Sequence, residues 1–333
     1  MKQAVLSSMP SGGSLRASLN AALNTLPIFP FRLLARTLGT LLLAALCVLP
    51  GRARAQIYVG VANNGNVGKY DVVSGSLNGS LVTGLVGNPT GLALSGNNLY
   101  VANSFTTTVG KYDATTGATI NDAFISGGSN PRGLLVSGNT LYVTSGSSFV
   151  TTYDATTGAV INPNFITSGL STPQGLALAG NILFVASATN NSVGAFDATT
   201  GAPIKTNFIT GLSNPVGLAL AGNHLFVANF FGNSIGEYDA TTGTEINANF
   251  VTGLGLPWGL AVSGNSLFVS DEQAFSVSKF DATTGSLLTA NLFRTQYAPQ
   301  GLAAVDVPEP TSAAFLAFAV PALLGLARAR RQG

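Results

Sequence analysis

Few residues in this 333-residue chain could do chemistry, and the best of them are two adjacent carboxylates. Asp271 and Glu272 stand in the stretch SDEQ, directly after a predicted strand. Because Ca²⁺ takes its ligands from carboxylate, amide and carbonyl oxygens, these two acids are the candidate residues for a calcium site. The alternative is that the chain uses no metal or cofactor.

A histidine-based site is not expected. The only histidine, His224, lies at a predicted hairpin turn, where other repeats carry Asn98, Thr140, Ile182 and Ser266. One histidine and one cysteine cannot supply the nitrogen and sulfur ligands of a conventional zinc site. The turn also places His224 on the wrong side of the predicted fold for a Ser–His–Asp triad. We therefore assign no catalytic residue.

Most of the aspartates belong to one recurring pentapeptide. The sequence DATTG is written five times and a looser copy, DVVSG, once, beginning at Asp71, Asp113, Asp154, Asp197, Asp239 and Asp281. An aspartate accepts hydrogen bonds from the backbone two residues on, and a glycine supplies the positive φ that ends a turn. Each copy therefore predicts a tight turn, and the alternative is a functional ring of carboxylates.

The elements that must position these residues repeat every 42 residues. A glycine that follows a Pro-x pair recurs at Gly91, Gly133, Gly175, Gly217, Gly259 and Gly301. Each unit contains four short segments that alternate apolar with polar residues, are rich in β-branched and aromatic side chains, and are separated by Gly, Asn and Pro. Six four-stranded units of this length predict an all-β, six-bladed β-propeller.

The two ends of the repeat region complement each other. The first unit begins at Ile57 without an innermost strand, and the segment Pro299–Val305 has the pattern of an innermost strand without the other three. Joined, they complete a sixth blade and hide both sheet edges. We therefore expect the propeller to occupy residues 56–306.

One position varies while its neighbours hardly change. The residue between the proline and the glycine is Thr90, Arg132, Gln174, Val216, Trp258 or Gln300. In the predicted strand order this residue lies near the mouth of the central channel, where tryptophan beside Arg and Gln side chains suits a sugar or another small polar ligand. The alternative is that these residues are exposed loop tips, which vary because packing does not constrain them.

The N-terminal segment, residues 1–55, predicts a secretory signal peptide with a long basic region. Its apolar run begins at Leu38 and ends before Ala53-Arg54-Ala55, which matches the small-residue pattern of a cleavage site that leaves Gln56 as the first residue. The single cysteine, Cys47, lies in the apolar run, so the mature protein is expected to have none.

The C-terminal segment, residues 307–333, has three parts in a fixed order. Pro308-Glu309-Pro310 is followed by an apolar stretch over residues 313–327 and then by Arg328, Arg330 and Arg331. On physical grounds this is a short membrane anchor whose basic end stays in the cytoplasm. The order resembles the PEP-CTERM sorting signal. That resemblance implies an exosortase-type protease as partner, transient anchoring in the inner membrane, and display at or release from the surface of a Gram-negative bacterium, often one that makes exopolysaccharide.

Charge excludes one class of function. Residues 56–306 contain six basic and twelve acidic residues, a net charge of −6, and no basic stripe. Nucleic-acid binding depends on clustered Lys and Arg, so it is not expected.

The repeat pattern, P-x-G-L-A, then L-Y-V-A-N, then Y-D, resembles that of six-bladed NHL-type propellers from Ile57 to Val305. That resemblance implies the fold, but propellers of this type include enzymes and binding platforms. Three hypotheses follow. The first is an exported, non-enzymatic binding or structural module associated with exopolysaccharide or biofilm. The second is a lactonase- or lyase-like enzyme, with or without a calcium ion. The third is a protein-docking scaffold with exposed Phe230, Phe231 and Phe275.

Overall fold

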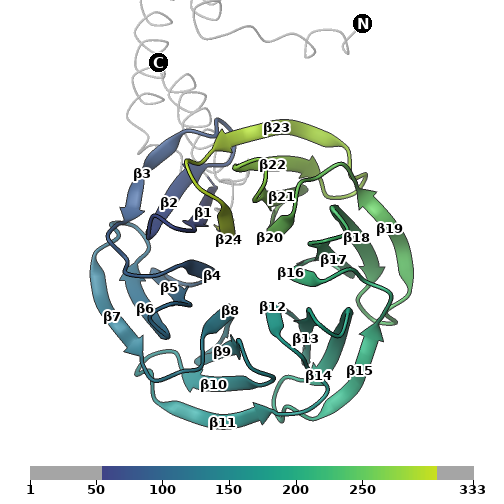
Figure 1. Cartoon of the computed structure of the whole chain (residues 1–333), viewed down its shortest axis with the longest axis horizontal. Coiled ribbons are helices and arrows are strands. Elements are labelled where there is room, and N and C mark those ends of the chain that lie inside the picture. The colour runs from purple at the N-terminus through teal and green to yellow at the C-terminus, as the bar shows by residue number, and fades with distance from the viewer. Residues whose placement is uncertain (1–54, 306–333) are drawn as a thin grey trace, which may run out of the picture. The chain divides into compact units, whose positions relative to one another are not determined.

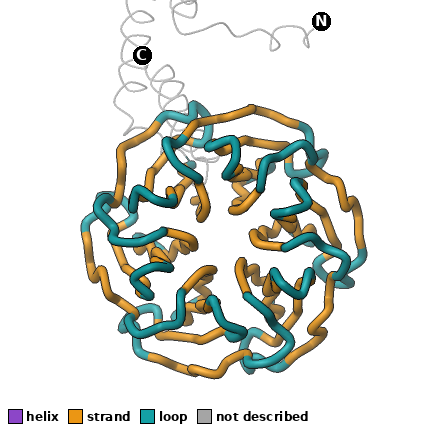
Figure 2. The backbone as a smooth tube through the Cα atoms, viewed as in Figure 1, coloured by secondary structure: helices purple, strands orange, loops and turns teal. Residues whose placement is uncertain are grey.

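The computed structural model describes residues 55–305, and all of the regular structure in that range is β-strand (Figure 1, Figure 2). Twenty-four strands form six antiparallel sheets of four strands each. The prediction of a six-bladed β-propeller with four-stranded blades is confirmed. Within residues 55–305 no helix is long and apolar enough to span a bilayer.

Blades are numbered along the chain, and their strands are given from the channel outward. Blade 1 contains β24 (Pro299–Val305), β1 (Gln56–Val61), β2 (Asn66–Asp71) and β3 (Leu77–Val82). Blade 2 contains β4 (Pro89–Ser95), β5 (Asn98–Asn103), β6 (Thr108–Asp113) and β7 (Thr119–Ile125). Blade 3 contains β8 (Pro131–Ser137), β9 (Thr140–Ser145), β10 (Val150–Asp154) and β11 (Val160–Ile166).

The remaining three blades repeat this order. Blade 4 contains β12 (Pro173–Ala179), β13 (Ile182–Ser187), β14 (Ser192–Asp197) and β15 (Pro203–Ile209). Blade 5 contains β16 (Pro215–Ala221), β17 (His224–Asn229), β18 (Ser234–Asp239) and β19 (Glu245–Val251). Blade 6 contains β20 (Pro257–Ser263), β21 (Ser266–Asp271), β22 (Ser276–Asp281) and β23 (Leu287–Arg294).

Blade 1 is assembled from both ends of the described chain. β24 pairs antiparallel with β1, so that Gln56 lies opposite Val305 and Val61 opposite Pro299. In Figure 1 the yellow strand β24 completes the purple blade. The closing strand leaves no open edge at the channel, as the sequence predicts.

The antiparallel register gives the disc two distinct faces. In each blade the first residue of the inner strand pairs with the last residue of the second strand, as Pro89 does with Asn103. The loops at that end form what we call the loop face. The SGN and DATTG turns lie at the other ends of the strands and form the turn face.

The hydrophobic core lies between neighbouring blades. Six clusters of buried side chains each combine residues of two adjacent blades. Three tyrosines of the second strands also donate hydrogen bonds across the blade boundary. Tyr58, Tyr100 and Tyr142 donate to the backbone oxygens of Ala114, Ala155 and Ala198, over 2.8, 2.6 and 2.8 Å. Phenylalanine replaces tyrosine in the last three blades, so this particular hydrogen bond is missing there. Other contacts cross those boundaries, such as the hydroxyl of Ser270, which donates to the backbone oxygen of Gln300 over 3.0 Å.

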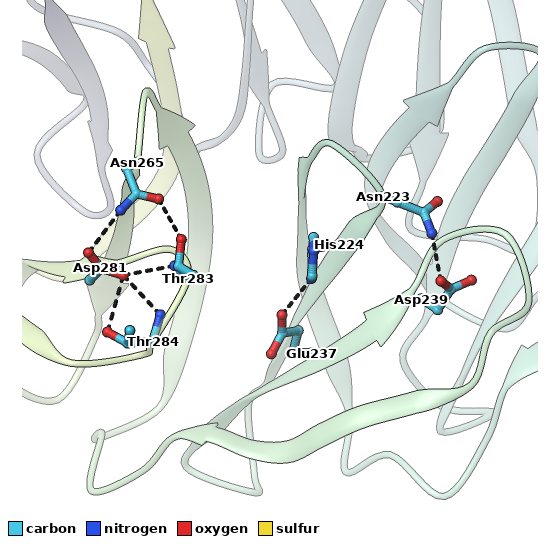
Figure 3. Close-up of polar contacts among 8 residues, drawn as sticks. All are labelled: Asn223, His224, Glu237, Asp239, Asn265, Asp281, Thr283 and Thr284. Atoms are coloured by element: carbon cyan, nitrogen blue, oxygen red, sulfur yellow. Dashed lines mark hydrogen bonds and ion pairs between the residues drawn. The ribbon is translucent and has the colours of Figure 1, made fainter.

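The DATTG turns are braced as predicted, with an additional partner. In Figure 3 the Oδ1 of Asp281 accepts the backbone N–H groups of Thr283 and Thr284, both over 2.9 Å. Asn265, the last residue of the SGN turn, donates to Oδ2 of the same aspartate over 2.8 Å and accepts the hydroxyl of Thr283 over 2.8 Å. The asparagine therefore ties the two turns of one blade together, and the carboxylates serve as turn braces rather than as an open ring.

We expect these turns to make the fold sensitive to acid. The pKa values of Asp113, Asp154, Asp197, Asp239 and Asp281 all lie below the ordinary value, chiefly because the backbone N–H of the second threonine bonds the ionised form. A lowered folded-state pKa contributes stability that is complete above the ordinary value of 3.8 and is lost as the pH falls below it.

The melting temperature should therefore fall as the pH drops below about 4. The variant Asp281→Asn removes one titrating brace, so its melting temperature should be lower at pH 7 but should decrease less steeply in acid. Thermal melts of both proteins between pH 7 and pH 3 check this prediction. An identical acid dependence in the two proteins would contradict it.

Candidate functional site

The inner strands surround a cavity in the central channel. They follow one another around the ring in the order β24, β4, β8, β12, β16, β20 (Figure 1). The cavity volume is about 80 Å³, which admits a few water molecules but not a complete sugar ring. Three tiers line it from the loop face inward: the variable ring residues, the glycines that follow them, and a set of leucines that includes Leu92, Leu134 and Leu176.

The six variable residues occupy equivalent places at the channel. Five of them line the cavity directly: Thr90, Arg132, Gln174, Val216 and Trp258. Gln300 has the same position in β24, and the residues that follow it, Gly301 and Leu302, also line the cavity. Their role in ligand binding stays a prediction.

The alternative of exposed, unconstrained loop tips is wrong. Each residue is the second of an inner strand, and Thr90, Gln174, Val216 and Gln300 are buried. The hydroxyl of Thr90, for example, donates to the backbone oxygen of Pro131 in the next blade over 3.3 Å. The variation at this position therefore changes the wall of the channel, not the tip of a loop.

Arg132 is a partly buried cation with little to neutralise it. Its guanidinium donates one long hydrogen bond, 3.5 Å, to Oε1 of Gln174, which is uncharged. Its Nε is buried and has no hydrogen-bond partner. Burial lowers the pKa of Arg132, although an arginine stays protonated in water at any ordinary pH. Arg132 also lines the cavity, so the N–H groups of its guanidinium other than the buried Nε are the donors offered to a ligand.

Trp258 lies across the channel from Arg132. β20 and β8 are three positions apart in a ring of six inner strands, so the two residues face each other across its axis. Phe230 packs edge-on against the Trp258 ring, with centroids 5.2 Å apart and an interplanar angle of 89°. This contact holds the indole as a fixed aromatic wall.

The loop that enters β20 is strained just before Trp258. Leu256 has a φ of 65°, a left-handed backbone conformation that costs leucine roughly 1–2 kcal/mol.

The sequence hypothesis that Phe230 is exposed is therefore wrong. Phe230 is half-buried because its ring lies between Trp258 and Phe231, whose ring centroid is 5.1 Å away. Phe231 and Phe275 are 66% and 47% exposed, as expected, and Phe105 in the equivalent loop of blade 2 is 75% exposed.

Glu272 reaches the ring through Gln300. Its Oε1 accepts a hydrogen bond of 2.6 Å from Nε2 of Gln300, and burial raises the pKa of the Glu272 carboxyl. The other polar atom of Gln300, Oε1, is buried without a partner. The hydrogen bond between Glu272 and Gln300 connects the carboxylate to the ring of variable residues, and the sequence alone did not predict this contact.

Asp271 braces the loops of blade 6. Its two carboxylate oxygens accept the backbone N–H groups of Gly255 and Ala274, over 2.6 and 2.9 Å. Among residues 55–305 no three His, Cys, Asp or Glu side chains converge on one point. A calcium ion would therefore have to draw most of its ligands from amide and carbonyl oxygens, and the calcium site stays a prediction.

His224 has a structural partner. Its Nδ1 lies 2.6 Å from Oε1 of Glu237, which is buried in β18 (Figure 3). Glu237 occupies the position held by Lys69, Lys111 and Lys279 in other blades, so the pair is peculiar to blade 5. The pair lies toward the turn face, away from the channel mouth, as expected for a residue at a hairpin turn.

Comparison with known proteins supports the repeat architecture. A family model described as outer membrane protein assembly factor BamB matches residues 121–207, about two blades. No curated protein matches the chain significantly. The chain shares a fold with known propellers. A chain in the crystal structure of a nidogen/laminin complex has a TM-score of 0.66 at 14% identity, over 75% of this chain and 98% of that chain.

A second solved structure, the computationally designed Ika8 protein, has a TM-score of 0.48 at 18% identity, over 74% of this chain and 77% of its own. At these identities only the nidogen/laminin similarity bears on structure, and it shows the fold alone. The site residues described above therefore have to be interpreted from their own geometry.

The predicted signal peptide and C-terminal sorting signal lie outside the described residues, except for Ala55 and Gln56 at the expected cleavage site. Ala53 of the expected cleavage site and the whole C-terminal segment, with Pro308, Glu309, Pro310, Arg328, Arg330 and Arg331, are not described. Ala55 directly precedes β1, and its backbone oxygen accepts the N–H of Val72 over 3.2 Å. Gln56 is the first residue of β1, so the expected cleavage would fall at the boundary of the fold.

Proposed function

We propose that the protein is an exported cell-surface or extracellular-matrix propeller that binds saccharide, such as a segment of exopolysaccharide, at the channel mouth on its loop face, and that it acts without catalysis. The arrangement that carries this proposal is the fixed Trp258 wall opposite Arg132, whose guanidinium lines the cavity and makes a single long hydrogen bond of 3.5 Å to Gln174. Sugars combine apolar ring faces with polar substituents, and a site of this composition suits both.

The position of the first and last residues of the propeller supports a role at a surface. Gln56 and Val305 pair with each other at the turn face, opposite the channel mouth. If the C-terminal segment is the PEP-CTERM-type anchor that its sequence resembles, the tail leaves from the turn face. An anchored propeller would then direct its channel mouth away from the membrane. The exosortase-type partner, the signal peptide and the NHL-type relationship belong to this proposal as well.

The single tryptophan provides the experiment. The full chain, in a mild detergent, is titrated with oligosaccharides prepared from bacterial exopolysaccharide while Trp258 fluorescence is followed. We expect a saturable change, because the indole lies at the proposed site and is the only tryptophan in the chain. The variant Trp258→Val, which carries the residue that blade 5 has at this position, should bind about tenfold or more weakly in calorimetry.

The control is Phe105→Ser, which removes an exposed aromatic side chain from the loop of blade 2. This variant should bind as the wild type does. Calorimetric binding that is unchanged in Trp258→Val would contradict the proposed site, and a flat response to every saccharide would contradict the proposed function.

Protein docking is a second candidate because three aromatic side chains are exposed on the loop face. Phe105, Phe231 and Phe275 are 75%, 66% and 47% exposed and occupy equivalent loops of three blades. Apolar side chains exposed in this way are typical of protein contacts. A defined complex with a surface protein that is lost in Phe231→Ser and retained in Trp258→Val would favour docking over saccharide binding.

A further inference from the structure

We infer that the saccharide bound at the channel mouth is acidic and that Arg132 binds its carboxylate. This inference rests on the proposed function and names the chemical class of its ligand. It begins from the state of Arg132, which is a partly buried cation with a buried, unpartnered Nε and a single 3.5 Å bond to a neutral amide. A buried charge without a counter-ion is costly, so the position favours an anion that arrives from outside.

No acid in the described part of the chain neutralises Arg132. The acids nearest to the ring, Asp271 and Glu272, belong to blade 6, across the channel from blade 3, and they are engaged by backbone N–H groups and by Gln300. Among residues 55–305 the ion pair recorded is that of His224 with Glu237, toward the turn face. The ring therefore offers a positive charge on one side and none of its own anions beside it.

The size of the cavity selects the part of the ligand that enters. A volume of about 80 Å³ accommodates a small planar group but not a pyranose ring. A hexuronate carries its carboxylate one bond outside the ring. The carboxylate can thus enter toward Arg132 while the sugar ring stays at the mouth beside Trp258 and Phe230.

The chemistry of the two groups is matched. An arginine guanidinium presents parallel N–H donors that fit the two oxygens of a carboxylate, and such charge-assisted bonds are stronger than bonds between neutral groups. A neutral saccharide would leave the Arg132 charge uncompensated, so the site should discriminate against it.

The test compares two probes that share the same sugar backbone and differ in charge. The full chain is titrated with oligogalacturonate and with its methyl ester while Trp258 fluorescence is followed. We expect oligogalacturonate to bind saturably and the ester to bind at least tenfold more weakly, because the loss of one charged hydrogen-bonded contact changes affinity by about that factor.

The variant Arg132→Gln should fold, since Gln174 and Gln300 already occupy this position in two other blades. It should bind oligogalacturonate at least tenfold more weakly than the wild type and should no longer prefer it over the ester. The matched control is Arg294→Gln, which removes the same charge from an exposed position on the outer strand β23 and should leave binding unchanged.

The outcomes separate the two proposals. Equal affinity for oligogalacturonate and its ester, or unchanged binding in Arg132→Gln, would overturn the acidic-ligand inference and leave saccharide binding in place. Binding of the ester but not of oligogalacturonate would also overturn the acidic-ligand inference and leave saccharide binding in place. Absence of binding by both probes would overturn the inference, and saccharide binding would fall with it if exopolysaccharide oligosaccharides also gave no response.

Discussion

Gly91→Val should destabilise the protein by about 3 kcal/mol or more, because the inner strands approach each other too closely for a side chain at this position. A Cβ built at Gly91 would lie 1.9 Å from the backbone oxygen of Arg132 and 3.0 Å from its carbonyl carbon. These atoms belong to the next blade and cannot move without displacing β8. Equivalent close approaches occur around the ring, as at Gly133, whose Cβ would lie 2.0 Å from the backbone oxygen of Gln174.

Chemical denaturation measures this effect, with Gly96→Ala as the matched control. Gly96 follows the same strand and has a φ of 56°, but a Cβ there would meet no atom within 4 Å. The control should therefore lose only the roughly 1–2 kcal/mol of a left-handed backbone conformation. If both variants unfolded at the same denaturant concentration, close packing of the inner strands would not limit stability as we argue.

Removal of the closing strand should have the other large effect. A chain that ends at Ala298 lacks β24, so β1 keeps β2 but loses its partner on the channel side, and the cluster around Val59, Phe268 and Leu302 is opened. The loss approaches the whole stability of a typical domain, about 5–15 kcal/mol. We expect this chain to aggregate or to unfold without a cooperative transition.

The control for this truncation is a chain that ends at Val305, which keeps β24 and omits only the residues after it. Because the ring is complete at that point, it should melt cooperatively, close to the full chain. Circular dichroism melts of both truncations check the prediction. A cooperative transition in the chain that ends at Ala298 would show that strand closure is not what holds blade 1 together.

The fold could be predicted from the sequence because each blade repeats the same alternation and the same turn residues. The 42-residue period places Gly91, Gly133 and their equivalents in register, and alternation places the neighbouring residue at the channel. That is why the position of Trp258 opposite Arg132 follows from strand order alone. The incomplete blades at the two ends likewise predict the β24–β1 closure.

The side-chain contacts around the channel mouth could not be predicted from the repeat pattern. The link between Gln300 and Glu272 joins residues that are 28 positions apart, and it depends on side-chain reach rather than on periodicity. The packing of Phe230 on Trp258 joins two blades, so that a residue predicted to be exposed supports a residue of the channel wall. The sequence does show an asparagine at the end of all five turns of this type, three of them SGN and two AGN. The aspartate that the asparagine of each turn bonds, Asp281 in the case of Asn265, becomes evident only when the two turns of a blade lie side by side.

The repeat pattern also could not predict that Arg132 lacks a charged partner. The sequence marks it as a rare arginine at a variable position, but whether an acid would meet it depends on which side chains converge in the folded ring. Only the structure shows that its single partner is the neutral Gln174 and that Nε is left without one. That observation is the basis for our inference that the site prefers an anionic ligand to a neutral one.

The central claim, that the ligand binds at the channel mouth on the loop face, is tested most directly by amide hydrogen exchange of the full chain with and without oligogalacturonate. We predict slower exchange in the loops that enter β8 and β20, residues 126–131 and 252–257, and no change in the DATTG turns on the opposite face. Protection confined to the turn face or to the outer strands, or no protection anywhere, would contradict the claim.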